Sequence, residues 1–328
     1  MRVRDGIGRR AALGLIGAAA SASAAAAQDW PTRPVRMVVP YPPGGASDVI
    51  ARLLAQPMTE ALGQTIVVEN RVGANGGIAA EHVARSAPDG YTLLMGNAGP
   101  NALNQALLGP RLNYDSIRDF TPISIVSKVP MVLAVHPATP VSTLQELLAY
   151  ARSRPGQVNY AVGGIGSAPH LTMEQMAEMN GVRWVAVPFR GGQLAIASVV
   201  AGQIPAIMDT AVVVLPQVRD GRLRGIAVTS EGRVPQAPDL PSIAEQGFPG
   251  FEATSWGGIL GPAGLPAPIV QRVHAAVLRA MALPEVRDAL VRQGVEPRTS
   301  APAEFAQHIA SELRRWSAVV EKSGIKPE

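Results

Sequence analysis

The stretch PYPPGGASD at residues 40 to 48 decides the fold. A short β-branched run, Val35–Val39, comes before it, and apolar residues at helical spacing follow it from residue 49 to 62. The helical pattern stops at Gly63, a residue that commonly ends helices. A strand, a glycine loop and a helix in this order open an α/β unit.

The same alternation continues outward from this loop. It predicts strands at 66 to 68 and 91 to 95 with a helix near 78 to 87. A second series of strands follows at 131 to 135, 158 to 161 and 184 to 187, then a short strand that ends at residues 208 and 209, and a last one at 223 to 228. Helices at 143 to 152, from the next glycine loop through 179, and from about 192 separate these strands. The pattern predicts two parallel αβ sets.

Two crossings divide the chain, one near residue 125 and one in the proline- and glycine-rich segment 230 to 250. We therefore predict a discontinuous first lobe, residues 28 to 125 plus 230 to 328, and a second lobe, residues 126 to 229. The C-terminal helix supports this division, because Phe305, Ile309, Leu313, Trp316 and Val320 form one apolar stripe that needs a lobe to cover it.

The N-terminus has the pattern of a secretory signal peptide over residues 1 to 27. Four arginines precede a run of small and apolar residues, and an Ala-x-Ala cleavage pattern ends just before Gln28. The run is too short and too rich in alanine and glycine for a membrane anchor. We expect export to the periplasm, and the pair Arg9 and Arg10 also permits a twin-arginine signal.

The composition excludes several kinds of site. The chain has no cysteine, so neither disulfides nor thiolate zinc sites are expected. Its five histidines show no metal-binding spacing, and we expect no metal or cofactor. Most of the formal charge of +4 comes from the presumed signal, and no basic stripe with interleaved aromatics is present. Nucleic acid is therefore not an expected partner.

The first glycine loop is a candidate anion site. Gly44 and Gly45 lie where the backbone N–H groups and the positive end of the following helix dipole converge, which attracts a carboxylate. The alternative is an ordinary strand-to-helix turn. The loop has neither the Gly-Lys-Ser/Thr ending of a phosphate-binding loop nor the dinucleotide pattern.

A second glycine loop, GGIGSAPH at 163 to 170, is expected to do the same work in the second lobe. Ser167 is placed as the helix N-cap, and His170 falls in the first turn, where it either satisfies the backbone or lines the cleft. The nucleophile pattern G-x-S-x-G fails because Pro169 replaces the second glycine. Ser167 is thus predicted to be a hydrogen-bond donor, and no catalytic residue is expected.

Three further residues stand at the ends of predicted strands, where ligands bind in open α/β sheets. They are Asn97, Arg190 and Asp209. Their alternative roles are a turn residue for Asn97, a surface cation for Arg190 and a helix cap for Asp209.

Seven ordered stretches of the chain resemble the substrate-binding proteins of tripartite tricarboxylate transporters, often called Bug receptors. They are YPPGGASD at 41 to 48, YDSIRDFTPIS at 114 to 124, GSAPHLTME at 166 to 174, VPFRGG at 187 to 192, AGQIPAIMD at 201 to 209, APDLPSIAEQGFPGF at 237 to 251 and SWGGILGPAGLP at 255 to 266. The resemblance extends over nearly the whole chain after residue 28, and these stretches mark it.

The resemblance implies a periplasmic, two-lobed flytrap that closes on a small organic carboxylate and delivers it to the permease subunits of the transporter. The ligand-binding set that we predict is Tyr41, Gly44, Gly45, Ala46, Ser47, Asn97, Gly164, Gly166, Ser167, His170, Arg190 and Asp209. Asp209 is expected near the distal part of the ligand. Arg190, where lysine is common in the family, could hold a second carboxylate by a bidentate contact.

A monomer is the default for a receptor that must close freely. Two other functions compete with transport. One is a receptor that docks on a signalling kinase, and the other is an exported hydrolase that uses Ser167 and His170. The nature of the acid is left open by the sequence, because the two loops would contact only the shared carboxylate.

Overall fold

A computed structural model describes residues 30 to 323 of the chain. The predicted signal peptide, residues 1 to 27, lies outside the described residues. The first glycine loop has the predicted surroundings, because strand β1 (Val35–Val39) leads into it and helix α2 (Ala46–Leu62) follows. Gly63, in the left-handed region at φ 74°, ends α2, and its N–H donates to the carbonyl of Thr59.

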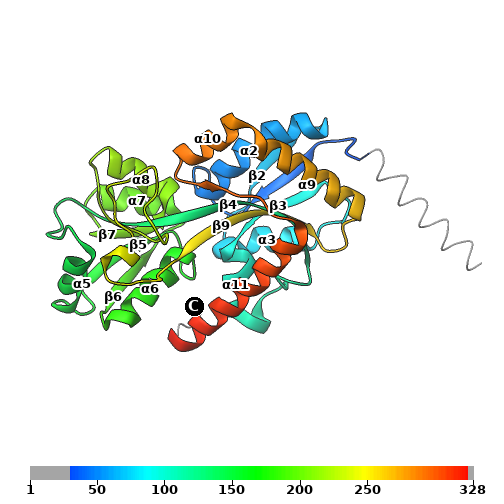
Figure 1. The fold of residues 1–328 in the computed structure, drawn as a ribbon. Coiled ribbons are helices and arrows are strands. Elements are labelled where there is room, and N and C mark those ends of the chain that lie inside the picture. The colour runs from blue at the N-terminus through cyan, green and yellow to red at the C-terminus, as the bar shows by residue number, and fades with distance from the viewer. Residues whose placement is uncertain (1–29, 324–328) are drawn as a thin grey trace, which may run out of the picture.

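Two series of strands and helices, joined by long strands, make up the described chain (Figure 1). The first series holds β1, α2, β2 (Ile66–Asn70), η1 (Ala74–Gly76), α3 (Gly77–Ala84), β3 (Thr92–Asn97), the π-helical turn η2 (Gly99–Leu103), α4 (Asn104–Leu108) and η3 (Gly109–Arg111). After β4 (Phe120–Val135) the second series holds α5 (Leu144–Arg152), β5 (Val158–Val162), α6 (Ala168–Asn180), β6 (Trp184–Pro188), α7 (Gly192–Val200), β7 (Ala206–Thr210), α8 (Ala211–Arg219) and β8 (Arg224–Val228). The chain ends with η4 (Ala244–Gln246), β9 (Thr254–Pro262), α9 (Ala267–Ala282), α10 (Pro284–Arg292), β10 (Glu296–Pro297) and α11 (Pro302–Ser323).

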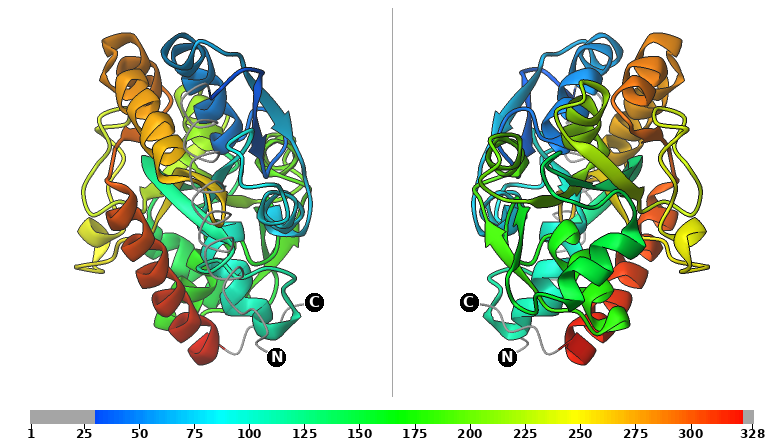
Figure 2. Two further views of the ribbon diagram at one scale, coloured as in Figure 1. Left: turned by 90° about the vertical axis from the view of Figure 1, so that its right-hand side faces the viewer. Right: turned by 90° about the vertical axis from the view of Figure 1, so that its left-hand side faces the viewer.

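The strands follow the order β2-β1-β3-β9-β4-β7-β5-β6. The groups β2-β1-β3 and β7-β5-β6 are parallel, as predicted, and form the sheets of the first and second lobe. The predicted last strand of the second series, β8, instead pairs antiparallel with β4. Helices α9 and α10 pack beside α2 on the first lobe (Figures 1 and 2).

Strand β4 belongs to both lobes. The sequence predicted a crossing and then a separate strand from residue 131, but the structure has one strand of 16 residues. Residues 120 to 130 pair with β9, and residues 131 to 135 pair antiparallel with β7 and, from residue 132, with β8. The partner therefore changes between Pro130 and Met131 without a break in the strand.

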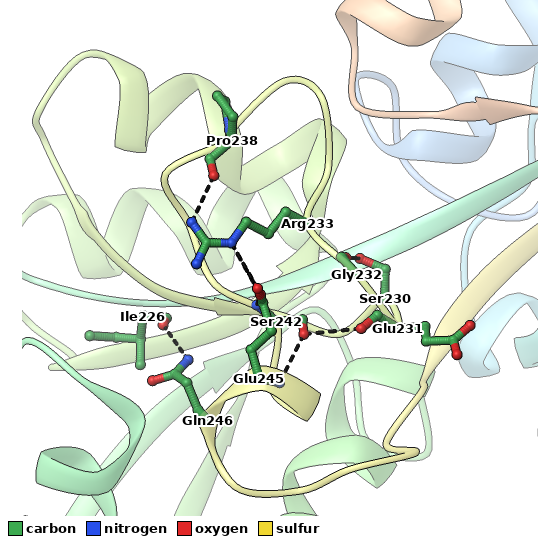
Figure 3. Close-up of polar contacts among 9 residues, drawn as sticks. All are labelled: Ile226, Ser230, Glu231, Gly232, Arg233, Pro238, Ser242, Glu245 and Gln246. Atoms are coloured by element: carbon green, nitrogen blue, oxygen red, sulfur yellow. Dashed lines mark hydrogen bonds and ion pairs between the residues drawn. The ribbon is translucent and has the colours of Figure 1, made fainter.

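The segment 230 to 246 folds against the second lobe (Figure 3). Arg233 Nε donates to Glu245, and the N–H of Ser242 donates to the same carboxylate. Gln246 Nε2 donates to the carbonyl of Ile226 in β8. The lobe boundaries stay predictions, and we propose from these contacts that the second crossing lies nearer residue 254, where β9 begins.

The C-terminal helix α11 turns the predicted stripe toward the lobes. Phe305, Ile309 and Trp316 are buried, whereas Leu313 and Val320 are only half-buried. Glu312 is also buried on this face of the helix. Its Oε2 accepts hydrogen bonds from the indole N–H groups of Trp256 and Trp316. A buried indole needs an acceptor, which explains a carboxylate on the apolar face. Among residues 30 to 323, no helix has both the length and the apolar character of a membrane span.

Candidate functional site

A cavity of about 90 Å³, measured as the space open to the centre of a water molecule, lies between the lobes. One water needs only about 10–15 Å³ by this measure, so the cavity has room for a small organic molecule. Its lining comes from both lobes and both long strands: Tyr41, Pro42, Gly45, Ala46, Ser47, Ile50, Asn97, Gly99, Val129, Gly163, Ser167, Ala168, Pro169, Gly191, Gly192, Gln193, Asp209, Thr210, Val213, Ser255, Trp256 and Gly257.

The first glycine loop presents the start of α2 to this cavity. Gly45 is the N-cap and offers no side chain, so no protein group caps the helix there. The first-turn residues Ala46 and Ser47 line the cavity, and the structure gives their N–H groups no intramolecular acceptor. Unpaired N–H groups at a helix start, together with the helix dipole, form an anion site.

A salt bridge on the far side of the loop fixes its shape. The Asp48 carboxylate accepts from Arg52 Nε at 3.0 Å, from the Gly44 N–H at 2.9 Å and from Asn70 Nδ2 at 2.9 Å. Burial opposes the ionisation of Asp48, but these donors outweigh it and lower the pKa of the carboxyl. Asp48 is therefore occupied by its own loop and leaves the N–H groups of the first turn to a ligand.

Side chains behind the loop form one hydrogen-bond network. Asn97, at the end of β3, donates to Ser47 Oγ at 3.0 Å and accepts from the Gly99 N–H at 3.0 Å. The Tyr41 hydroxyl donates to Asn75 Oδ1 at 3.0 Å. Burial raises the pKa of Tyr41, so the phenol stays protonated. The network holds Tyr41, Ser47 and Asn97 against the cavity.

The polar groups of the second glycine loop form hydrogen bonds with one another. Ser167 Oγ donates to the Gly164 carbonyl at 2.7 Å and accepts from the His170 N–H at 3.4 Å, as expected of an N-cap. His170 Nδ1 accepts from the Gly166 N–H at 3.2 Å. Pro169 has no N–H to offer. The loop borders the cavity through Gly163, Ser167, Ala168 and Pro169 but offers fewer free donors than the first loop.

A third glycine junction, at the start of α7, faces the cavity as well. Gly191, Gly192 and Gln193 line it, and Gly191 at φ 109° is the uncapped N-cap of α7. In the sequence, Gly191 and Gly192 follow Arg190, and only Arg190 was predicted to bind a ligand. Glycines between a strand and a helix identified the first loop as a candidate site, and the same signal would have identified this junction.

Asp209 is the only acidic residue among the described residues that line the cavity. It stands at the end of β7 and is 7% exposed. Its Oδ1 accepts from the Thr210 N–H at 2.7 Å and from Thr210 Oγ1 at 3.2 Å. Burial raises the pKa of this carboxyl to about 6, against the weaker opposing effect of the two bonds from Thr210.

The apolar part of the lining comes from Ile50, Val129, Val213 and Trp256. Trp256 lies on β9, with its indole held by Glu312 and its ring edge-on to Phe305. In the sequence, Trp256 belongs to one of the seven resembling stretches, and no role in the site was predicted for it. Nothing in the local sequence indicates that a residue some 200 positions from the first loop closes the same cavity.

Several contacts across the cleft show that the lobes are closed in this structure. Gln193 Nε2 donates to the Gly44 carbonyl at 2.8 Å, and Asn75 Nδ2 donates to the Gly166 carbonyl at 3.0 Å. A Cβ on Gly191 would lie 2.8 Å from the Pro42 ring. The lobes therefore meet through backbone that only glycine permits.

The structure brings together seven of the predicted ligand-binding residues, namely Tyr41, Gly45, Ala46, Ser47, Asn97, Ser167 and Asp209. Four others, Gly44, Gly164, Gly166 and His170, shape the loops without lining the cavity. Arg190 is exposed and lies outside the lining of this cavity. Ligand binding by the whole set stays a prediction.

The charge of the lining is unusual for an anion site. Among the described residues that form it, no lysine, arginine or histidine is present. The described chain also holds no group of three histidine, aspartate or glutamate side chains placed to bind a metal ion. An anion in the cavity would therefore depend on N–H groups, hydroxyls and amides.

Comparison with known proteins agrees on one family. Residues 50–325 match the family model of the tripartite tricarboxylate transporter family receptor. The chain is 35% identical to Protein BugT of Bordetella pertussis over 312 residues, which cover 95% of each chain.

Solved structures are similar over the same length. R. palustris Rpa4515 with adipate superimposes with a TM-score of 0.87 at 37% identity, over 92% of this chain and all of that one. MatC of Rhodopseudomonas palustris with bound malate gives 0.84 at 36% identity, over 89% of this chain and all of that one. The predicted α/β flytrap fold is confirmed.

Proposed function

The chain belongs to the tripartite tricarboxylate transporter receptor family, and from this membership we propose that it captures a small organic carboxylate between its lobes in the periplasm. Two related structures that contain adipate and malate support a carboxylate as the ligand. The family match favours a transport receptor over the alternative of a receptor for a signalling kinase.

One observation carries the proposal. The uncapped start of α2 lines the cavity between the lobes, with the N–H groups of Ala46 and Ser47 unpaired. Helix α2 has 17 residues, so its dipole is fully developed at this end. A carboxylate oxygen satisfies these donors, whereas an uncharged ester or amide gains much less from the dipole.

We propose that the ligand drives closure. It would contact the start of α2 from the first lobe and the junctions before α6 and α7 from the second, so its affinity is higher for the closed form. The closed receptor, acting as a monomer, would then dock on the permease subunits of the transporter.

Catalysis has no support in the geometry. The hydroxyl of Ser167 donates to the Gly164 carbonyl, and His170 Nδ1 accepts from the Gly166 N–H. A serine nucleophile needs its hydroxyl bonded to a base. Here both groups are turned to the backbone of their own loop, so we propose that the protein is a binding protein and not a hydrolase.

A thermal-shift screen of the purified protein tests the carboxylate assignment. We expect at least one small organic acid to raise the Tm and its uncharged amide or methyl ester to leave the Tm unchanged. Silence across the acids, together with a shift for a sugar, metal or nucleotide, would contradict the proposed function.

A further inference from the structure

The cavity contains a buried acid with no cation to balance it. Asp209 is 7% exposed, and Tyr41 is the only other titratable residue in the described lining. Thr210 donates to Oδ1 through its N–H and hydroxyl, while the structure records no protein donor to Oδ2. Oδ2 is not among the buried unpartnered atoms of the described chain, so it is open to the cavity and can accept a hydrogen bond from a ligand.

Two cavity-lining glycines pack against the Asp209 carboxylate. An added Cβ on Gly192 would lie 2.7 Å from Oδ2, and one on Gly163 would lie 3.4 Å from it. Because neither residue carries a side chain, no side chain from these two positions covers the carboxylate or displaces it from the cavity.

A ligand that fills a cavity of about 90 Å³ cannot stay far from Asp209. A second carboxylate on the ligand would meet an acceptor of the same charge, and no lysine, arginine or histidine of the described lining would offset the repulsion.

We propose that Asp209 is the selectivity residue of the cavity: it accepts a hydrogen bond from a hydroxyl, amide or ammonium group at the far end of a ligand with one carboxylate, and it disfavours dianions. This inference rests on the proposed function, since it assumes that a carboxylate binds at the start of α2. To the proposed function it adds a preference of the site for acids with one carboxylate.

Two matched series of acids test the proposal. Each series keeps the chain length and changes one end: hexanoate, 6-hydroxyhexanoate and adipate, and then butyrate, 4-hydroxybutyrate and succinate. Calorimetry at pH 8 measures their affinities for the wild type, for Asp209→Asn, and for Asp220→Asn as a control. Asp220 is an exposed acid at the opposite end of α8, outside the cavity.

In the better-binding series, the wild type and Asp220→Asn should bind the hydroxy acid at least about tenfold more tightly than the diacid. Asp209→Asn should reduce this ratio to about one or reverse it, because the neutral amide can donate to a carboxylate. A ratio that stays the same in Asp209→Asn, or a wild type that prefers the diacid, overturns the inference. Silence with all six acids overturns the proposed function and this inference with it.

A second measurement needs no variant. In wild-type protein at pH 7, the diacid should bind with uptake of about one proton, while the hydroxy acid should bind with almost none. Calorimetry in two buffers of different ionisation enthalpy measures this difference. Equal proton uptake for the two acids would contradict the proposal even if Asp209→Asn failed to fold.

Discussion

The glycine junctions before α6 and α7 look alike in sequence, yet they meet the cavity differently. The junction before α6 caps itself, since Ser167 bonds to its own loop and Pro169 has no N–H. The junction before α7 has no side-chain cap and lies against Pro42 of the opposite lobe. A glycine loop at a helix start is therefore an anion site only where the loop leaves its own donors unsatisfied.

Gly191→Ala should break the closed state. Its Cβ would lie 2.8 Å from the Pro42 ring across the cleft, at a residue with φ 109°. We expect affinity for the best-binding acid to fall about 1,000-fold, or about 4 kcal/mol, because the lobes can no longer meet. Calorimetry measures the loss, and small-angle scattering should show that the acid no longer compacts the protein.

Gly164→Ala is the matched control in the other junction. Gly164 also has a positive φ, 157°, but an added Cβ there meets no atom within 4 Å. Strain alone should then lower the free energy of unfolding by about 1–2 kcal/mol and leave closure intact. Equal losses of affinity in the two variants would mean that strain and not the cross-cleft contact is responsible.

Asp209→Asn should stabilise the protein without ligand. The carboxyl has a pKa of about 6 when folded against 3.8 as the reference value, so the folded state resists ionisation. The penalty is absent below about pH 4, grows as the pH rises to 6 and is complete above that. Two pKa units correspond to about 3 kcal/mol, which is the upper limit of the gain. Urea unfolding should show this gain at pH 7 and none at pH 4.

The cross-cleft bond from Asn75 should have a smaller effect. Asn75 has φ 47°, which glycine tolerates, and its amide links the Tyr41 hydroxyl to the Gly166 carbonyl of the other lobe. Asn75→Gly should weaken acid binding about fivefold to tenfold, the value of one or two neutral hydrogen bonds. Gln193→Ala removes the more exposed bond to Gly44 and should cost about twofold. A larger effect of Gln193→Ala than of Asn75→Gly would mean that the stronger contact between the lobes is the one at the α7 junction.

Ser167→Ala should have the smallest effect on binding. The hydroxyl caps α6 and is turned to its own loop, so its loss should cost about 1 kcal/mol of stability. We expect the affinity for the acid to change less than threefold. A loss of tenfold or more in calorimetry, with an unchanged Tm, would show that Ser167 contacts the ligand and that the two junctions are equivalent after all.

Local patterns predicted much of the first lobe. The strand, loop and helix around Gly44 and Gly45 form as expected, and Asn97 and Asp209 both line the cavity from strand ends. Arg190 is exposed and outside the lining while its neighbours Gly191 and Gly192 line the cavity, so its contact with a ligand stays a prediction. The prediction of a crossing followed by a separate strand from residue 131 was wrong, because β4 continues through Pro130 and changes its pairing partner there.

The sequence by itself determined the α/β alternation, the glycine-bearing helix starts and the family, because each depends on residues that are close along the chain. The tertiary structure alone decided which of these helix starts remains uncapped, that Asn75 meets Gly166 and Trp256 closes the cavity, and that Asp209 faces it without a cation. Those facts depend on pairs far apart in sequence, which only packing brings together. The charge of a site is set by what encloses it, and the enclosure is a property of the fold.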